Sequence, residues 1–143
     1  MVGKKIDELL GMDIPVEMIA PSHGVLWRDE PLQIVQAYQQ WARQEPAERA
    51  VVLYDTMWNA TRRMADAVGE GLAAGGVDHK LFHTAVTDRN DMLTEIFRAG
   101  AVVIGSPTLN NGLLPTITPL LADCKGLKFR NKIGAAFGSY GWS

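Results

Sequence analysis

The segment AVVLYDTMWNAT, residues 50–61, decides the fold of this chain. Its first five residues are apolar or aromatic with no polar alternation, which is typical of a strand buried on both faces of a parallel sheet. Residues 61–74 then carry an apolar stripe at helical spacing and end at a glycine pair, Gly75-Gly76. We therefore expect a buried strand, a short polar loop and an amphipathic helix, in that order.

The same alternation of strand and helix repeats to the end of the sequence. We predict strands at 50–54, 79–83, 101–105 and 132–137, and helices at 61–74, 88–99 and 113–124. The third strand reads as fully buried, like the first. In the last helix Pro115 fits only in the first turn, and Pro119 predicts a kink or break because proline removes a backbone donor. Four strands separated by three helices imply a parallel sheet with right-handed crossovers.

A polar seam, residues 44–49, separates this alternation from an N-terminal segment of different pattern. Residues 31–43 carry apolar side chains at three- and four-residue steps, which predicts a helix, with Asp29 as a plausible cap. A short apolar stretch, residues 16–20, lies before it. We therefore divide the chain into residues 1–45 and 48–143.

Composition excludes some classes of partner and indicates no activity. The 143 residues are 47% hydrophobic and 21% charged, which suits an ordinary soluble domain. A net charge of -2 provides no bulk attraction to nucleic acid or an anionic membrane. No apolar run approaches the roughly 20 residues of a spanning helix, and no signal peptide is evident. The single cysteine, Cys124, fits a reducing compartment, so we expect a cytoplasmic protein.

The loop after the first strand, residues 56–61, has the chemistry of a phosphate site. Two threonines and an asparagine flank a helix N-terminus, where hydroxyls, backbone N–H groups and the helix dipole favour an anion. It lacks the Gly-Lys-Ser/Thr of a Walker loop and the glycines of a dinucleotide loop. An ordinary capped helix is the alternative. A phospho-acceptor site at Asp55 is a further alternative. Such a site needs another aspartate at the end of the third strand, where this chain has Ser106-Pro107.

Two further loops, residues 106–112 and 139–143, follow the third and fourth strands. In an open parallel sheet ligands bind at the carboxyl ends of the strands, so the three loops lie at one edge. Asn111 and Gly112 tolerate left-handed backbone, and the aromatic side chains of the third loop suit stacking on an isoalloxazine ring. Together the loops match FMN. The candidate FMN-binding residues are Thr56, Met57, Trp58, Asn59, Ala60, Thr61, Pro107, Thr108, Leu109, Asn110, Asn111, Gly112, Ser139, Tyr140, Gly141 and Trp142.

These loops resemble those of the flavodiiron family, the A-type flavoproteins, in which a metallo-β-lactamase-like domain precedes a flavodoxin-like domain. YDTMWNAT (54–61) resembles that family's phosphate loop, and GSPTLNNG (105–112) and GSYGWS (138–143) resemble its other two flavin loops. Trp58 and Asn59 stand where short-chain flavodoxins usually have threonine and glycine, which favours the flavodiiron branch.

For the fold, the resemblance implies an α/β, flavodoxin-like, doubly wound parallel sheet in the order 2-1-3-4, with its last strand missing. Residues 48–143 would form this truncated FMN-binding domain. Residues 1–45 would be a strand and helix remnant of the metallo-β-lactamase-like domain, together with a linker helix.

The N-terminal segment MIAPSHGVLWR, residues 18–28, resembles the end of the family's metal domain. The resemblance makes His23 the counterpart of the last di-iron ligand, but the family's other ligands have no counterpart before it. We therefore expect His23 to be a remnant and the di-iron centre to be absent from this chain. His79 and His83 would stand about 13 Å apart along a strand, too far to share a metal, and Cys124 is expected to be a core thiol.

For function, the resemblance implies the FMN-binding electron-transfer module of an oxidoreductase that reduces dioxygen, nitric oxide or both. It also implies a rubredoxin-like electron donor and a head-to-tail homodimer. Whether this chain alone is an enzyme stays open, because it lacks most iron ligands. One alternative is a flavodoxin-like NAD(P)H:acceptor reductase, although no nicotinamide site is evident. Another is a cofactor-free fragment that only associates with a partner.

Overall fold

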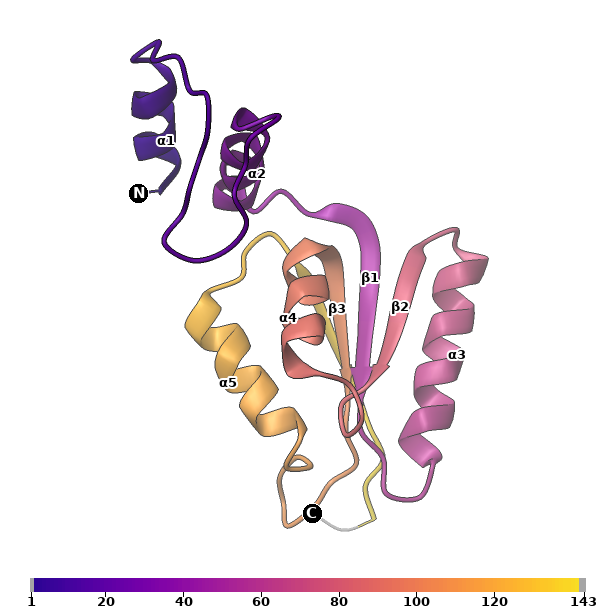
Figure 1. Ribbon diagram of the computed structural model, residues 1–143. Coiled ribbons are helices and arrows are strands. Elements are labelled where there is room, and N and C mark those ends of the chain that lie inside the picture. Colours follow the sequence, from indigo (N-terminus) through magenta and orange to yellow (C-terminus); the bar gives the residue numbers. More distant parts are fainter. Residues whose placement is uncertain (1, 142–143) are drawn as a thin grey trace. The chain divides into compact units, whose positions relative to one another are not determined.

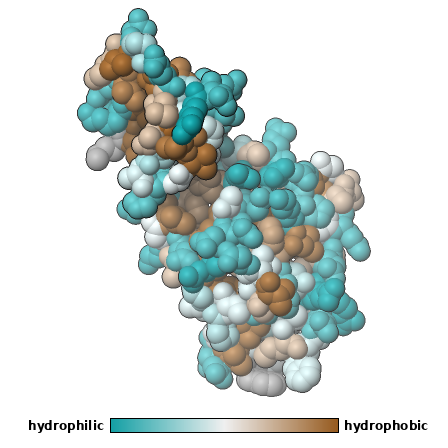
Figure 2. Space-filling view, in the orientation of Figure 1, coloured by the Kyte–Doolittle hydropathy of each residue, from teal (hydrophilic) through white to brown (hydrophobic). Residues whose placement is uncertain are grey.

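The computed structural model describes residues 2–141, and the chain divides into two compact units, Met1–Glu45 and Pro46–Ser143. The first unit contains α1 (Val2–Leu10) and α2 (Leu32–Arg43), with an antiparallel bridge between Ile19 and Trp27 on the segment that joins them. Many of its apolar side chains are exposed, and they give the brown areas at the upper left of Figure 2.

Helix α2 confirms the helical pattern of residues 31–43 but not its predicted cap. The N-cap is Pro31, without a side-chain hydrogen bond in the described structure, so the assignment of Asp29 was wrong. Proline is suited to a helix start because its φ is already helical and it needs no hydrogen-bond acceptor for a backbone donor. Helix α1 was not predicted, and none of its residues is buried.

The second unit is a parallel sheet in the order β2-β1-β3-β4, as predicted. Its elements, shown in Figure 1, are β1 (Ala47–Tyr54), α3 (Ala60–Ala74), β2 (Asp78–His83), α4 (Arg89–Arg98), β3 (Ala99–Gly105), α5 (Ile117–Leu127) and β4 (Ile133–Phe137). Helix α3 covers one face of the sheet, whereas α4 and α5 lie on the other. This is the flavodoxin-like, doubly wound arrangement, so the predicted fold class is confirmed.

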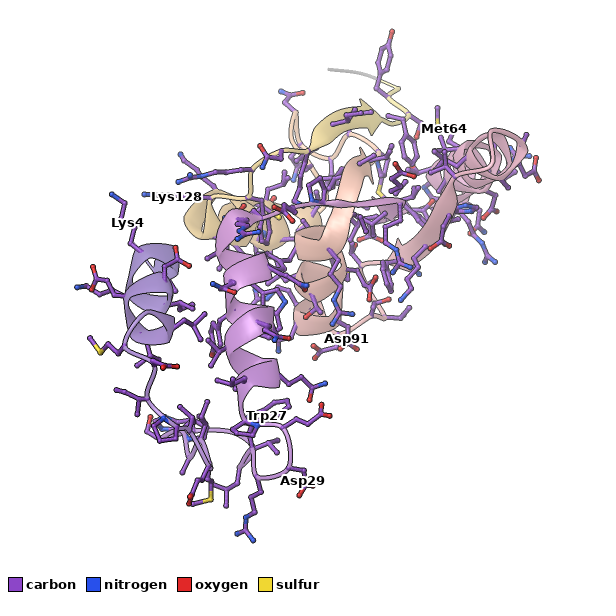
Figure 3. The ribbon with its side chains drawn as sticks, turned by 90° about the horizontal axis from the view of Figure 1, so that it is seen from above. Lys4, Trp27, Asp29, Met64, Asp91 and Lys128 are labelled. Carbon is purple, nitrogen blue, oxygen red and sulfur yellow. The ribbon has the colours of Figure 1, made fainter. Side chains whose placement is uncertain are left out.

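The core lies on both sides of β1, whose last five residues are buried as predicted. Because side chains alternate along a strand, Val51 and Leu53 pack against Ile96 of α4, while Val52 and Tyr54 pack on the side of α3. Figure 3 labels Met64 on α3, Asp91 on α4 and Lys128 at the end of α5, which locate the three helices around the sheet.

Strands β3 and β4 are less buried than β1, and for β3 this differs from the prediction of a fully buried strand. The middle of β3 is half-buried instead of fully buried, and β4 forms an edge of the described sheet with Ile133 74% exposed. Helix α5 begins at Ile117, later than predicted, so Pro115 precedes it and Pro119 is its third residue. A kink is not needed there, because the first backbone N–H groups of a helix have no intrahelical partner in any case.

Lys132, just before β4, binds carbonyl oxygens at the end of α4. Its ammonium group donates hydrogen bonds to the carbonyl oxygens of Phe97 and Ala99, at 2.9 and 2.6 Å. It also lies 5.8 Å from the centre of the Phe129 ring. Partial burial lowers the pKa of Lys132 from its ordinary value.

Candidate functional site

The loop from β1 to α3 presents polar groups that lack partners. Within the described residues, the hydroxyl oxygens of Thr56 and Thr61 are closed to solvent and make no hydrogen bond. Asn59 is the N-cap of α3, in the left-handed region at φ 62°, and its side chain does not cap the helix. The alternative that these three residues simply cap a helix is therefore not what the structure shows.

The same loop lies at the positive end of a helix of 15 residues and contains no lysine or arginine. A buried hydroxyl without a partner costs free energy, so each of these hydroxyls gains if a ligand oxygen becomes its partner. An anion with several acceptor oxygens, such as a phosphate monoester, supplies such oxygens. The loop therefore fits a phosphate group, held by hydroxyls and backbone donors instead of a cation.

The loop after β3 is built around a two-residue turn. Leu109 and Gly112 exchange both backbone hydrogen bonds, at 3.0 and 2.9 Å. Asn110 and Asn111 lie between them in the left-handed region, at φ 50° and 59°, which is the geometry of a hairpin turn that asparagine favours. Asn111, which the sequence indicated as tolerant of this backbone, adopts it, whereas Gly112 does not, because the turn needs positive φ only at its two central residues.

Backbone hydrogen bonds join the second loop to the third. Ser106 donates to the carbonyl of Phe137 at 3.2 Å, and Thr108 donates to that of Ser139 at 2.9 Å. The two backbones approach so closely that a Cβ at position 138 would lie 2.0 Å from the carbonyl oxygen of Ser106. Only glycine fits at Gly138, so this contact fixes the spacing of the two loops.

All three loops leave the carboxyl edge of the sheet, at the lower end of Figure 1. Two of their aromatic side chains are open to solvent, Trp58 being 88% and Tyr140 78% exposed. Pro107 is buried, whereas Gly141 is exposed. Trp142 was also predicted to contact the ring, and it lies outside the described residues. The edge therefore combines an anion loop with exposed aromatic surface, which suits a ligand that has a phosphate and a flat ring.

Sequence reasoning set aside one residue that the structure places at the centre of this edge. Asp55 is only 6% exposed, and its carboxylate accepts hydrogen bonds from three donors among the described residues. Its donors are the backbone N–H of Thr56 at 2.7 Å, Nε2 of His83 at 3.1 Å and the hydroxyl of Thr116 at 2.5 Å. The His83 ring also stacks on Tyr54, with 5.2 Å between ring centres. The available signal was an aspartate directly after a buried strand and a histidine at the end of the next.

The other candidate ligands are dispersed. The imidazole Nδ1 of His23 lies 3.2 Å from the Ser22 hydroxyl, and that of His79 lies 3.2 Å from the carbonyl of Val77. Across residues 2–141 no three His, Cys, Asp or Glu side chains are grouped so as to hold a metal ion. In the same part of the chain, no helix has the length and apolar character to cross a membrane.

Cys124 packs against the core cluster of α4, α5 and the sheet, as expected for a core thiol. Burial raises the pKa of its thiol above the ordinary value, and the carboxylate of Asp123 raises it further. The thiolate form is therefore disfavoured at neutral pH.

Residues 52–143 match the flavodoxin family. The chain belongs to that family. It is 49% identical over 142 residues to a nitric oxide reductase from Moorella thermoacetica, a match that covers 99% of this chain and 36% of that protein.

Solved structures of flavodiiron-type proteins also match this chain. Rubredoxin oxygen:oxidoreductase from Desulfovibrio gigas matches with a TM-score of 0.93 and 42% identity, over 98% of this chain and 35% of the other. The flavodiiron protein from Giardia intestinalis matches with a TM-score of 0.87 and 29% identity, over 99% and 36%. The resemblance to flavodiiron proteins is therefore confirmed. The chain spans about a third of the length of these relatives.

A flavodoxin domain implies FMN as its cofactor. The described residues fit this molecule at its phosphate end, because two buried hydroxyls without partners, on Thr56 and Thr61, lie at the start of a helix with no cation in the loop. They also fit its ring end, since two loops joined by backbone hydrogen bonds and exposed aromatic side chains lie at the same sheet edge.

Proposed function

We propose that this chain is the FMN-binding electron-transfer module of a flavodiiron oxidoreductase that reduces dioxygen, nitric oxide or both. The observation that carries the proposal is the pair of buried hydroxyls without partners, Thr56 and Thr61, in a cation-free loop at a helix N-terminus. The names of similar proteins support the reaction class, since one is a nitric oxide reductase and another a rubredoxin oxygen:oxidoreductase.

Different loops would bind the phosphate and the ring of the cofactor. Residues 56–61 would bind the phosphate through hydroxyls and backbone N–H groups. The ring would be bordered by two loops. One is residues 107–112, with the asparagine turn, and the other is residues 139–142, with aromatic side chains. FMN, when bound, supplies the ability to accept electrons from one protein and pass them to another. The chain's own part is to orient that ring and leave one edge open.

The partners follow from the same proposal. A rubredoxin-type protein would deliver electrons, as the name of the Desulfovibrio gigas protein suggests. The parent enzyme would work in the cytoplasm as a head-to-tail homodimer. His23 would be a remnant of the family's last di-iron ligand, and the di-iron centre would be absent from this chain.

Flavin titration of the purified chain tests the proposal. We expect FMN to bind and change its visible absorption, and riboflavin to bind at least tenfold more weakly because it lacks the phosphate that the hydroxyls would contact. Riboflavin is the matched control, since its ring is identical. Failure to bind FMN, or equal affinity for the two flavins, would overturn the proposal.

A second measurement separates the proposal from an NAD(P)H:acceptor reductase. With FMN bound and oxygen excluded, NADH or NADPH alone should leave the flavin absorption unchanged. Rapid bleaching by either nucleotide would favour the reductase, because it would show direct access of a nicotinamide to the ring.

A further inference from the structure

The buried carboxylate of Asp55 lies between two of the loops proposed to hold FMN. It follows β1 directly, and its backbone N–H extends the sheet by a hydrogen bond to the carbonyl of Gly105 at 3.1 Å. One carboxylate oxygen accepts the N–H of Thr56, the first residue of the phosphate loop, at 2.7 Å. The other accepts the hydroxyl of Thr116, the residue before α5, at 2.5 Å.

Thr116 is an N-cap residue that does not cap its own helix. An N-cap threonine ordinarily accepts a hydrogen bond from a backbone N–H of the first turn, but no such bond is present in the described structure. Its hydroxyl proton points to Asp55 instead. The start of α5 is therefore hydrogen-bonded to the residue that follows β1, and the segment that leads from the second loop into α5 ends at this contact.

The Thr116 hydroxyl has a second neighbour in Thr84. A hydroxyl has one proton, and that of Thr116 is given to Asp55. The Thr84 hydroxyl lies 2.9 Å from that of Thr116 and 3.3 Å from the carbonyl oxygen of Tyr54, so both oxygens are acceptors within its reach. The residue after β2 therefore also lies at the contact between Thr116 and Asp55.

Two hydrogen bonds connect the second loop, residues 106–112, to the start of α5. The backbone N–H of Leu114, which follows the loop, donates to the hydroxyl of Ser106, the first residue of the loop, at 3.0 Å. The carbonyl of Leu114 accepts from the N–H of Ile117, the first residue of α5, at 3.0 Å. Thr116, which lies between Leu114 and Ile117, is therefore connected to the second loop through Leu114 and Ser106.

We propose that Asp55 and Thr116 are positioning residues that couple the phosphate loop to the second flavin loop, so that an anion bound in the first orders the second. The hydroxyls of Thr56 and Thr61 are closed to solvent, so an anion must rearrange the loop to reach them. That rearrangement moves the N–H of Thr56, and Asp55 passes the change to Thr116. Neither positioning residue contacts the ligand. The inference rests on the proposed phosphate site.

Hydrogen exchange with inorganic phosphate as the probe tests the coupling directly. In the unsubstituted chain, saturating phosphate should slow amide exchange in residues 56–61 and also in residues 106–116. In Thr116→Val only the first loop should respond, because valine keeps the shape and removes the hydroxyl. Thr116→Ser should restore the response, and Thr118→Val, an exposed change on the same helix, should leave it intact.

Flavin affinities give a second readout that a purely structural role would not produce. We expect Thr116→Val to weaken FMN binding about fivefold, the factor for one hydrogen bond of average strength, and to change riboflavin binding less than twofold. Equal weakening of both flavins would show a structural role and overturn the coupling. Asp55→Asn, which alters the same contact, should reproduce the result if the valine variant folds poorly.

Hydrogen exchange separates a failure of the coupling from a failure of the phosphate site. If phosphate protects residues 56–61 but not 106–116 in the unsubstituted chain, the coupling is wrong and the phosphate site stands. If phosphate protects neither loop and FMN does not bind, the proposed function is wrong and the coupling falls with it.

Discussion

The substitution Thr61→Val should stabilise the ligand-free chain and weaken its binding of FMN. The Thr61 side chain is fully buried, and its hydroxyl has no partner in the described structure. Burying a hydroxyl without a hydrogen bond costs about 1–3 kcal/mol, and valine has the same shape without that group. We therefore expect a gain of about 1 kcal/mol in the free energy of unfolding, the lower end of that range.

The expected loss of affinity for FMN comes from the hydrogen bond that valine cannot donate to the phosphate. A hydrogen bond to a charged acceptor contributes about 1.5–3 kcal/mol, which corresponds to a dissociation constant for FMN about 10- to 150-fold higher. Riboflavin, which has no phosphate, should bind the variant as it binds the unsubstituted chain. The difference between the two flavins isolates the phosphate contact from any general disturbance of the site.

Urea denaturation followed by circular dichroism, with and without FMN, measures the first quantity, and fluorescence titration measures the second. Thr61→Ser is the matched control. It keeps the hydroxyl but removes a buried methyl group, so it should lose about 1 kcal/mol of stability and retain preference for FMN over riboflavin. A Thr61→Val variant that is less stable without ligand, or that keeps the full preference for FMN, would refute the reasoning.

Three further predictions concern packing, capping and titration. Gly138→Ala should cost about 3 kcal/mol in thermal or urea unfolding, because its Cβ would lie 2.0 Å from the carbonyl oxygen of Ser106. Gly134→Ala is the control and should be nearly neutral, because among the described residues, its chain neighbours apart, no atom lies within 4 Å of the added Cβ. Lys132→Met should cost about 1–3 kcal/mol, since it leaves two carbonyl oxygens at the end of α4 without their donor; unchanged stability would contradict that account. Burial and the Asp123 carboxylate raise the pKa of Cys124, so the rate of its alkylation by iodoacetamide should rise at a higher pH than the rate for an ordinary thiol. Asp123→Asn should move the midpoint of this pH–rate profile to lower pH. A midpoint that does not move would exclude the aspartate as a cause.

The sequence predicts the sheet well where local pattern and burial agree. Residues 50–54 are apolar without alternation, and the structure buries them on both faces. Residues 101–105 have nearly the same pattern, but the middle of that strand is only half-buried. The difference lies in what packs on the strand, and a strand's own residues do not encode that.

Helix boundaries depend on contacts that the local pattern does not contain. The spacing of apolar residues predicted a start near residue 113, whereas α5 begins at Ile117. The intervening residues connect the second loop to the helix, and the backbone N–H of Leu114 there donates to the hydroxyl of Ser106, eight positions earlier. Such a contact competes successfully with helix formation.

The candidate site was predictable as far as its loops and not as far as their connections. Residues of the type that bind phosphate could be recognised from their position after a strand and before a helix. The role of Asp55 could not, because its donors on His83 and Thr116 lie 28 and 61 residues away. The sheet register pairs Tyr54 with His83, and only that register brings the histidine beside the carboxylate.

We expect affinity for FMN and reduced stability of the ligand-free chain to have the same origin in this site. A loop without cations can bind a phosphate only through hydrogen-bond donors and the helix dipole. Donors that bind the ligand have no partner when the ligand is absent. For Thr56 and Thr61 the structure shows this condition, since both hydroxyls are buried and unpaired in the described chain. Because a ligand that binds only the folded state stabilises it, FMN should raise the stability of this chain by more than contacts at the ring alone would produce, and riboflavin should not.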